Sequence, residues 1–419
     1  MMKCMKGLGL LLAGVVAFTG CDREDPTSIG GVLIPDESVR TFEVILDADD
    51  FLVMDTAFST FPPAQSNFIV LANSYEGVLS ANELMRFRVS PIIGVPDSAG
   101  VIQVDSLPKL ISGRLVVKFD TVASDRTGPV VLHLYRAGEM WDSTDVSWQN
   151  RTAGTPWATP GGTRGALLDT ATFATADSVV FDVDTATLAA WRDSTTQVPG
   201  VLLTAESPDV RLRGLTPTLF VNMQTSIGDT VVTVPVPPFV KRTIQDPVPP
   251  PSSSDPHVGG VPSWRTILQL DPDFENLEVP CPFSATCTVR LRDASIARAE
   301  LLLQPVVSPP GFAPELPLTV LVYTLLPTPE LPLVRSPLAT GQGFTTISNG
   351  NFRTPGAPIA PIQITSYIRS VVTPADTTAF RTRYLTLMQG GTTTVGYGTF
   401  SAGPQLRLRL SVSQEIQLP

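Results

Sequence analysis

The sequence predicts an all-β protein, built as two antiparallel jelly-roll-like β-sandwiches in tandem. Short runs of alternating apolar and polar residues recur along the 419 residues, and turn-forming residues bound each run. The chain contains 40 Pro and 31 Gly, scattered throughout, which argues against long helices. A proline-rich stretch divides the chain, and similar series of strands lie on both sides of it.

The chain begins with the features of a secretory signal peptide. Residues 1–20 place Lys3 and Lys6 before an apolar run that is too short to cross a bilayer. The sequence FTGC at 18–21 resembles the lipobox of bacterial lipoproteins, whose cysteine becomes the lipidated first residue of the mature chain. The resemblance implies lipidation at Cys21 and a lipid anchor in the outer membrane of a bacterial cell envelope. An ordinary signal peptide cleaved nearby is the alternative.

Residues 21–40 are expected to form a tether. The acids that directly follow the cysteine resemble the acidic tethers that send some lipoproteins to the cell surface. The alternative is a solvated linker without a sorting role. The formal net charge of the chain is -10, without a basic cluster, which argues against nucleic acid as a partner.

The first sandwich is expected at 41–245 and the second at 261–419, with a Pro/Ser-rich linker at 246–260. The segment LRLRLSV, residues 406–412, shows the period-two pattern of a half-buried strand most clearly. Five segments of the first part correspond in order to five of the second: 82–91 with 263–271, 111–119 with 295–305, 130–136 with 318–325, 179–193 with 362–372, and 199–206 with 383–390. We therefore expect the second part to repeat the plan of the first.

Two cysteines remain after the signal and the anchor. Five residues separate Cys281 from Cys287 in PCPFSATC, which predicts a local disulfide at a hairpin tip in an exported protein. His133 and His257 lie far from them and lack ligand spacing, so no metal site is expected. The acids of LDADDF, residues 46–51, offer clustered oxygens for a structural calcium, but without EF-hand spacing.

The segment WDSTDVSWQNR, residues 141–151, combines two tryptophans with short polar side chains. Its context resembles the DNRLRE-type domain of secreted bacterial proteins, a jelly-roll-like β-sandwich, over about residues 80–210. The matching positions are Trp141, Asp145, Val146, Ser147 and Trp148, then Phe181, Asp182, Val183 and Trp191, then Gly200 to Leu203. The resemblance implies the fold, and some members of that family bind polysaccharide.

Two interpretations of this segment stay open. Tryptophan offers a large apolar area and one N–H group, so Trp141 and Trp148 are suited to fastening a long loop onto the sandwich. Alternatively, a tryptophan is a platform for a sugar ring, and if only one is exposed we expect it to be Trp157. The candidate ligand-binding residues are Trp141, Asp145, Trp148, Gln149, Asn150 and Trp157.

No catalytic residue is assigned. The two histidines have poor surroundings for a catalytic base, because His133 lies in an alternating strand and His257 in the proline-rich linker. None of the common catalytic fingerprints is present. Paired acids are the one remaining route to catalysis, because glycoside hydrolysis needs two carboxyl groups. The candidates by proximity are Glu206 with Asp209, Asp182 with Asp184, and Asp47 with Asp49 and Asp50.

The sequence therefore predicts a non-catalytic cell-envelope lipoprotein that binds extracellular polysaccharide or serves adhesion. The alternative is a structural or assembly protein that contacts another envelope protein through strand edges and apolar loops. A glycan-cleaving enzyme is the third hypothesis.

Overall fold

The computed structural model describes residues 39–413, apart from 62–67, 97–99, 194, 196, 228–229 and 373–381. The expected signal peptide, Cys21 and nearly all of the tether lie outside the described residues. The described chain is antiparallel β-structure with three short α-helices, α2 (Ala48–Phe51), α3 (Thr185–Arg192) and α4 (Thr365–Val372). The all-β prediction is confirmed. No helix within the described ranges has the length and apolar character needed to cross a bilayer.

Residues 68–246 form one pair of facing sheets, which we call the inserted sandwich. The larger sheet contains, in order, the described strands β11 (Arg164–Phe173), β8 (Val130–Ala137), β13 (Val201–Ala205), β4 (Leu79–Arg86), β3 (Phe68–Tyr75) and β14 (Val210–Leu215), with β17 (Val240–Asp246) also paired to β4. The smaller sheet contains, in order, β12 (Ser178–Val183), β7 (Lys109–Lys118), β15 (Thr218–Gln224) and β16 (Val231–Val236). Alternate residues of both sheets, among them Leu132, Leu115 and Val221, pack into one core.

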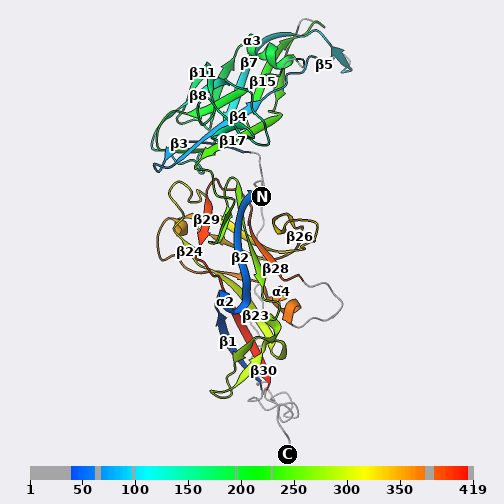
Figure 1. Cartoon of the computed structure of the whole chain (residues 1–419). Helices are drawn as coiled ribbons and strands as arrows, with labels where there is room; N and C mark the ends of the chain where they lie inside the picture. Colours follow the sequence, from blue (N-terminus) through cyan, green and yellow to red (C-terminus); the bar gives the residue numbers. More distant parts are fainter. Residues whose placement is uncertain are drawn as a thin grey trace, which may run out of the picture.

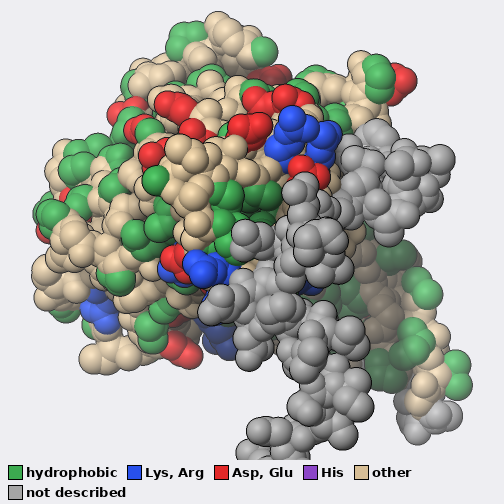
Figure 2. Space-filling model, turned by 90° about the horizontal axis from the view of Figure 1, so that it is seen from below, with side chains coloured by type: hydrophobic (Ala, Val, Ile, Leu, Met, Phe, Trp, Pro, Cys, Tyr) green, Lys and Arg blue, Asp and Glu red, His purple; other side chains and the backbone are tan. Residues whose placement is uncertain are grey.

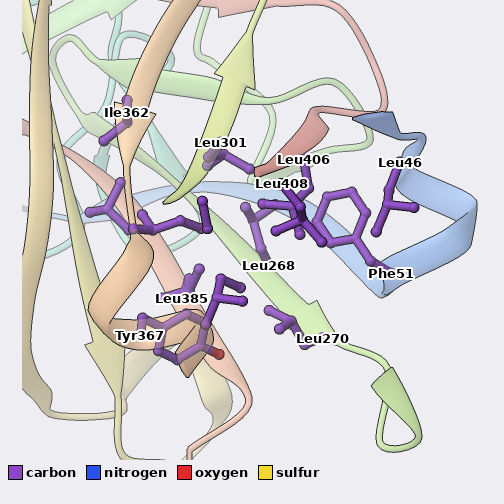
Figure 3. Packing of buried hydrophobic residues seen from close by; sticks show 14 of the residues in the cluster. Leu46, Phe51, Leu268, Leu270, Leu301, Ile362, Tyr367, Leu385, Leu406 and Leu408 are labelled. Carbon is purple, nitrogen blue, oxygen red and sulfur yellow. The ribbon is translucent and has the colours of Figure 1, made fainter. Parts of the chain in front are cut away.

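Residues 39–61 and 252–413 form a second pair of sheets, which we call the split sandwich. One sheet contains, in order, the described strands β24 (Pro305–Val306), β29 (Tyr397–Phe400), β19 (His257–Gly259), β20 (Ser263–Leu270), β28 (Tyr384–Gly390), β25 (Leu318–Leu325) and β26 (Leu338–Ile347), with β2 (Leu52–Phe61) paired to β20 and to β18 (Ser252–Ser253). The other contains β1 (Val39–Leu46), β30 (Gln405–Ser413), β23 (Ser295–Leu303) and β27 (Ala360–Gln363). In Figure 3, Leu46 and Phe51 lie beside Leu406 and Leu408 in its core.

Three small hairpins complete the described strands: β5 (Ile93–Pro96) with β6 (Ile102–Asp105), β9 (Asn150–Thr152) with β10 (Thr155–Pro156), and β21 (Glu278–Pro280) with β22 (Thr288–Arg290). In the third hairpin, Cys281 and Cys287 form a disulfide with a Cα–Cα distance of 5.2 Å, as predicted. The disulfide closes the tip just beyond the paired residues Pro280 and Thr288.

The two sandwiches share one plan. The order β11-β8-β13-β4-β17 in the first corresponds to β26-β25-β28-β20-β2 in the second, and β12-β7-β15-β16 corresponds to β27-β23-β30-β1. Helices α3 and α4 follow the corresponding strands β12 and β27. The repeated strand order predicted from the sequence is therefore present.

The expected tandem arrangement is wrong at the N-terminal end. β1 pairs with β30 and β2 pairs with β20, so residues 39–61 belong to the split sandwich and not to the first one. They stand in the places that β16 and β17 occupy in the inserted sandwich. The chain thus begins the split sandwich, leaves it to build residues 68–246, and returns to complete it (Figure 1).

The expected linker at 246–260 is also more ordered than predicted. β18 pairs with β2, and β19 pairs with both β20 and β29. Val258 is fully buried, and the His257 ring lies 4.8 Å from the ring of Trp264. Burial lowers the pKa of His257. The prolines are confined to positions beside these very short strands, where no long ladder is interrupted.

Candidate functional site

The tryptophan-rich segment covers the outer face of the larger sheet of the inserted sandwich. Trp141 and Trp157 are only 3% and 4% exposed, and they pack on Leu84, Leu202 and Ile244. Both indole N–H groups donate to backbone carbonyls: Trp141 Nε1 to Pro199 O at 2.7 Å, and Trp157 Nε1 to Ser147 O at 3.0 Å. The loop is therefore fastened by its tryptophans, as the packing interpretation expects.

The other candidate residues of this segment lie on its outer side. Trp148 is half-buried and packs over Gly161, where an added Cβ would come within 2.8 Å of the indole. Asp145 and Gln149 are exposed, and Asn150 is half-buried. The expectation that Trp157 is the exposed tryptophan is wrong, because the loop folds over it and Trp148 lies outermost. Neither Trp141 nor Trp157 presents a ring face to solvent.

A cation–π contact links this segment to a pocket at the end of β4. The guanidinium of Arg86 lies 4.2 Å from the centre of the Trp141 ring and donates to the Trp141 carbonyl. Arg86 Nε is buried without a hydrogen-bond partner, and burial lowers the pKa of Arg86, which the charge of Asp142 opposes. Among the described residues, Arg86 forms no ion pair with a carboxylate.

The pocket has a volume of about 160 Å³ and lies where four segments of the inserted sandwich meet. Its lining residues are Arg86, Phe87, Arg88, Met140, Ala190, Trp191, Asp193, Gln197, Val198 and Phe239. Phe87 and Trp191 are buried, with ring centres 5.2 Å apart, whereas Phe239 is 53% exposed.

Polar groups stand around these rings. The guanidinium of Arg88 lies 5.3 Å from the centre of the Phe239 ring. Asp193 Oδ1 accepts hydrogen bonds from the backbone and the hydroxyl of Thr195, and Gln197 is exposed. The pocket thus combines aromatic faces with guanidinium, carboxylate and carboxamide groups, which is the usual composition of a small-ligand site.

Sequence reasoning missed this pocket. Arg86 and Arg88 alternate at the end of a predicted strand, which is an ordinary solvent-facing pattern. Phe239 stands some 150 positions later in a proline-rich run. The pairing of β17 with β4, which begins at Val240 opposite Arg86, and the backbone bond from Phe239 N to Arg86 O, 3.0 Å, bring the two together. The one available signal was an aromatic residue directly after two prolines, between two strands.

Several of the acids considered as catalytic candidates bond to an arginine or to backbone N–H groups. Glu206 pairs with Arg164 at 3.0 Å and lies 3.7 Å from His133 Nδ1, while Asp209 Oδ1 accepts from the backbone of Glu76. Asp184 accepts from the backbone of Thr187 and caps α3. Glu206, Asp209 and Asp184 are thus each bonded to basic or backbone groups of the fold.

The acids of LDADDF have a structural role as well. Asp47 and Asp50 form a capping box at the start of α2. Within the described ranges, no group of three or more His, Cys, Asp or Glu side chains is arranged to hold a metal ion.

No family model matches the chain, and no curated protein matches it. Among solved structures, the chain is similar to two structures of infectious bursal disease virus, of the Gx and Gt strains, with 12% and 13% identity. Each alignment covers 92% of this chain and 74% of the viral chain, with TM-scores of 0.14 and 0.10. TM-scores this low carry no argument about fold or function, and the resemblance to the DNRLRE-type domain stays a prediction.

Proposed function

We propose that this protein is a non-catalytic lipoprotein of the bacterial cell envelope that binds extracellular polysaccharide in the pocket beside Phe239. The observation that carries the proposal is the exposed Phe239 ring, which stands with Arg88, Asp193 and Gln197 around one hollow. An aromatic face gives broad apolar contact to the C–H face of a sugar ring, and the polar groups bond its hydroxyls.

The size of the pocket supports one ring and not a longer ligand. A cavity of about 150 Å³ with apolar walls accommodates benzene in another protein. A pocket of about 160 Å³ that is open to solvent therefore suits a single sugar residue whose neighbours extend outwards. Such a site binds one sugar residue of a polymer.

The proposed cellular location rests on the signal-like segment at residues 1–20 and on Cys21. The signal-like segment and Cys21 support lipid anchoring in the outer membrane, on its periplasmic face or at the cell surface. On the face seen in Figure 2, acidic and basic side chains are interspersed among uncharged ones, without a basic field. This distribution supports partners other than nucleic acid.

Affinity electrophoresis through polysaccharide gels tests the proposal. The full-length chain, purified in detergent, is compared with Phe239→Ala and Gln197→Ala, and with Val122→Ala as a control. Val122 is 79% exposed and does not line the pocket, so its loss should leave binding unchanged. We expect Phe239→Ala to weaken binding at least about fivefold. Equal retardation of wild type and Phe239→Ala would exclude this pocket.

A second candidate function has an observation of its own. The β5–β6 hairpin projects from the inserted sandwich (Figure 1), and Ile102, Val104 and Leu107 are 63%, 66% and 77% exposed. An exposed strand with apolar side chains favours a protein partner, as an assembly role requires. A photo-crosslinking residue at Val104 should then give one discrete adduct in intact cells, and one at Val122 should give none. No adduct at Val104 contradicts the assembly role.

A further inference from the structure

A second hollow lies on the split sandwich, where the edge strand β26 meets β27. Its lining residues are Gln342, Gly343, Phe344, Gln363, Thr365 and Ser366, and its volume is about 390 Å³. Phe344 is 68% exposed, although it stands within a strand and not at the tip of a loop. The Phe344 ring contributes little burial free energy to the fold, so its apolar area is available to a ligand.

The side chains around Phe344 are polar and uncharged. Gln342 Nε2 makes one long bond, 3.3 Å, to the carbonyl of Thr340, and Gln363 Nε2 makes one of 3.5 Å to the Thr365 hydroxyl. Each carboxamide has two donor hydrogens and an accepting oxygen, so most of this capacity is left for other groups. Ser366 adds an exposed hydroxyl.

The backbone around the hollow is well fixed. Phe344 stands opposite Leu321 in the β25–β26 ladder. At Gly343, an added Cβ would lie 2.2 Å from the carbonyl oxygen of Gln363, so this glycine permits the close approach of β27. Thr365 Oγ1 both accepts from Ala299 N and donates to Ala299 O. The groups that line the hollow are thus placed before any ligand arrives.

The inserted sandwich shows that the fold does not require an aromatic residue here. Strands β11 and β26 correspond, have ten residues each and show the same series of buried and exposed positions. The seventh residue is Thr170 in β11 and Phe344 in β26. The sixth is Asp169, whose carboxylate accepts from the backbone of Asp182, and in β26 it is Gly343. One copy joins the two strands here through a charged side chain, and the other through close backbone approach at Gly343, beside an exposed ring.

We propose that this hollow is a second binding site, which takes one residue of a neutral polysaccharide with its ring stacked on Phe344. The carboxamides of Gln342 and Gln363 bond the hydroxyls, and the lack of charged lining residues disfavours acidic sugars. This site is independent of the Phe239 pocket because its residues belong to the other sandwich. Two sites on one chain raise the avidity for a polymer that reaches both.

The test uses the full-length chain in detergent and four neutral glycans: dextran, laminarin, galactomannan and hydroxyethylcellulose, with polygalacturonate as the acidic comparison. Phe344→Ala, Phe344→Trp, Phe239→Ala and the double alanine variant are compared with wild type by affinity electrophoresis. Thr170→Ala is the matched control, because it changes the corresponding position of β11. Thermal melting checks that each variant is folded.

We expect at least one neutral glycan to retard the wild type. Phe344→Ala should weaken binding to that glycan about fivefold, and Phe344→Trp, with its larger ring, should strengthen this binding. Thr170→Ala should behave as wild type. Equal retardation of Phe344→Ala and wild type by every neutral glycan, or no retardation of the wild type by any, overturns the proposal. If Phe344→Ala binds like wild type and Phe239→Ala loses binding, the second site is excluded and the proposed function stands. If Phe239→Ala binds like wild type and Phe344→Ala loses binding, only the second site stands.

Discussion

The guanidinium of Arg211 lies 3.9 Å from the carboxylate of Glu315, and the two buried residues come from different sandwiches. Arg211 also pairs with Asp125 at 2.7 Å and donates to the carbonyls of Gly311 and Ala313 at 3.0 and 2.9 Å. Glu315 accepts from the backbone N–H groups of Val395 and Gly396. The junction is therefore fixed by an ion pair and by hydrogen bonds from Arg211 to backbone carbonyls, as well as by apolar contacts.

Replacing Arg211 should destabilise the protein strongly. Burial raises the pKa of Glu315, an effect that Arg211 opposes, so Arg211→Met leaves a buried acid without its cation. We expect a loss of about 3–5 kcal/mol in urea unfolding. Arg211→Met combined with Glu315→Gln should lose less than Arg211→Met alone, because the uncompensated charge is gone. An equal or larger loss in the double variant would show that the two charges are not coupled.

Glu83 should make stability fall as pH rises. Burial raises its pKa to about 8, while the hydroxyl of Thr243 and the charges of Lys241 and Arg242 oppose the shift. Between the ordinary value near 4.5 and about 8, the folded state keeps a proton that the unfolded chain releases, so unfolding becomes easier by up to about 1.4 kcal/mol per pH unit. Glu83→Gln should remove this slope. Urea unfolding from pH 5 to 8.5 measures the difference between the two proteins, and parallel pH profiles would contradict the prediction.

The tryptophans should differ in their effect on stability. Trp141→Ala and Trp157→Ala each remove a buried aromatic side chain, at an expected cost of about 3–5 kcal/mol. Trp148→Ala should cost clearly less, because this ring is half-buried. Denaturant titrations of the three variants make the comparison. A cost at Trp148 equal to that at Trp141 would place Trp148 in the packed layer.

The disulfide should contribute modestly. Cys281 and Cys287 close a short loop, so replacing both by serine should cost about 2 kcal/mol by the loop-entropy relation. Thermal unfolding of the double variant, compared with wild type under oxidising and reducing conditions, measures this. Reducing agent should destabilise the wild type and leave the variant unchanged.

Strand positions were predictable because each half-buried strand has its own alternation. Leu406, Leu408, Leu410 and Val412 were expected on one face of a strand, and all four are buried. The partner of each strand was not predictable, because period two tells which face is buried and not which neighbour supplies the hydrogen bonds. For this reason the placement of β1 and β2 with the split sandwich could not be inferred.

The candidate sites were predicted less well. Trp141 and Trp157 were singled out as aromatic residues in a polar stretch, yet the loop covers both. Phe239 and Phe344, which are exposed aromatic residues of the described part of the chain, stand beside residues distant in the sequence or across a sheet edge. Local sequence gives the chemistry of a side chain, whereas its exposure depends on packing between distant segments.

The ladder between β1 and β30 has a consequence for the order of folding. Leu46 stands opposite Leu406, so the whole intervening chain must be synthesised before this pair can form. Such distant pairing is slow, because a large loop must close before any contact stabilises it. The inserted sandwich, whose described strands lie between residues 68 and 246, closes shorter loops. The chain should therefore acquire its middle first and its two ends last, with the edge of β30 open to other strands until β1 arrives.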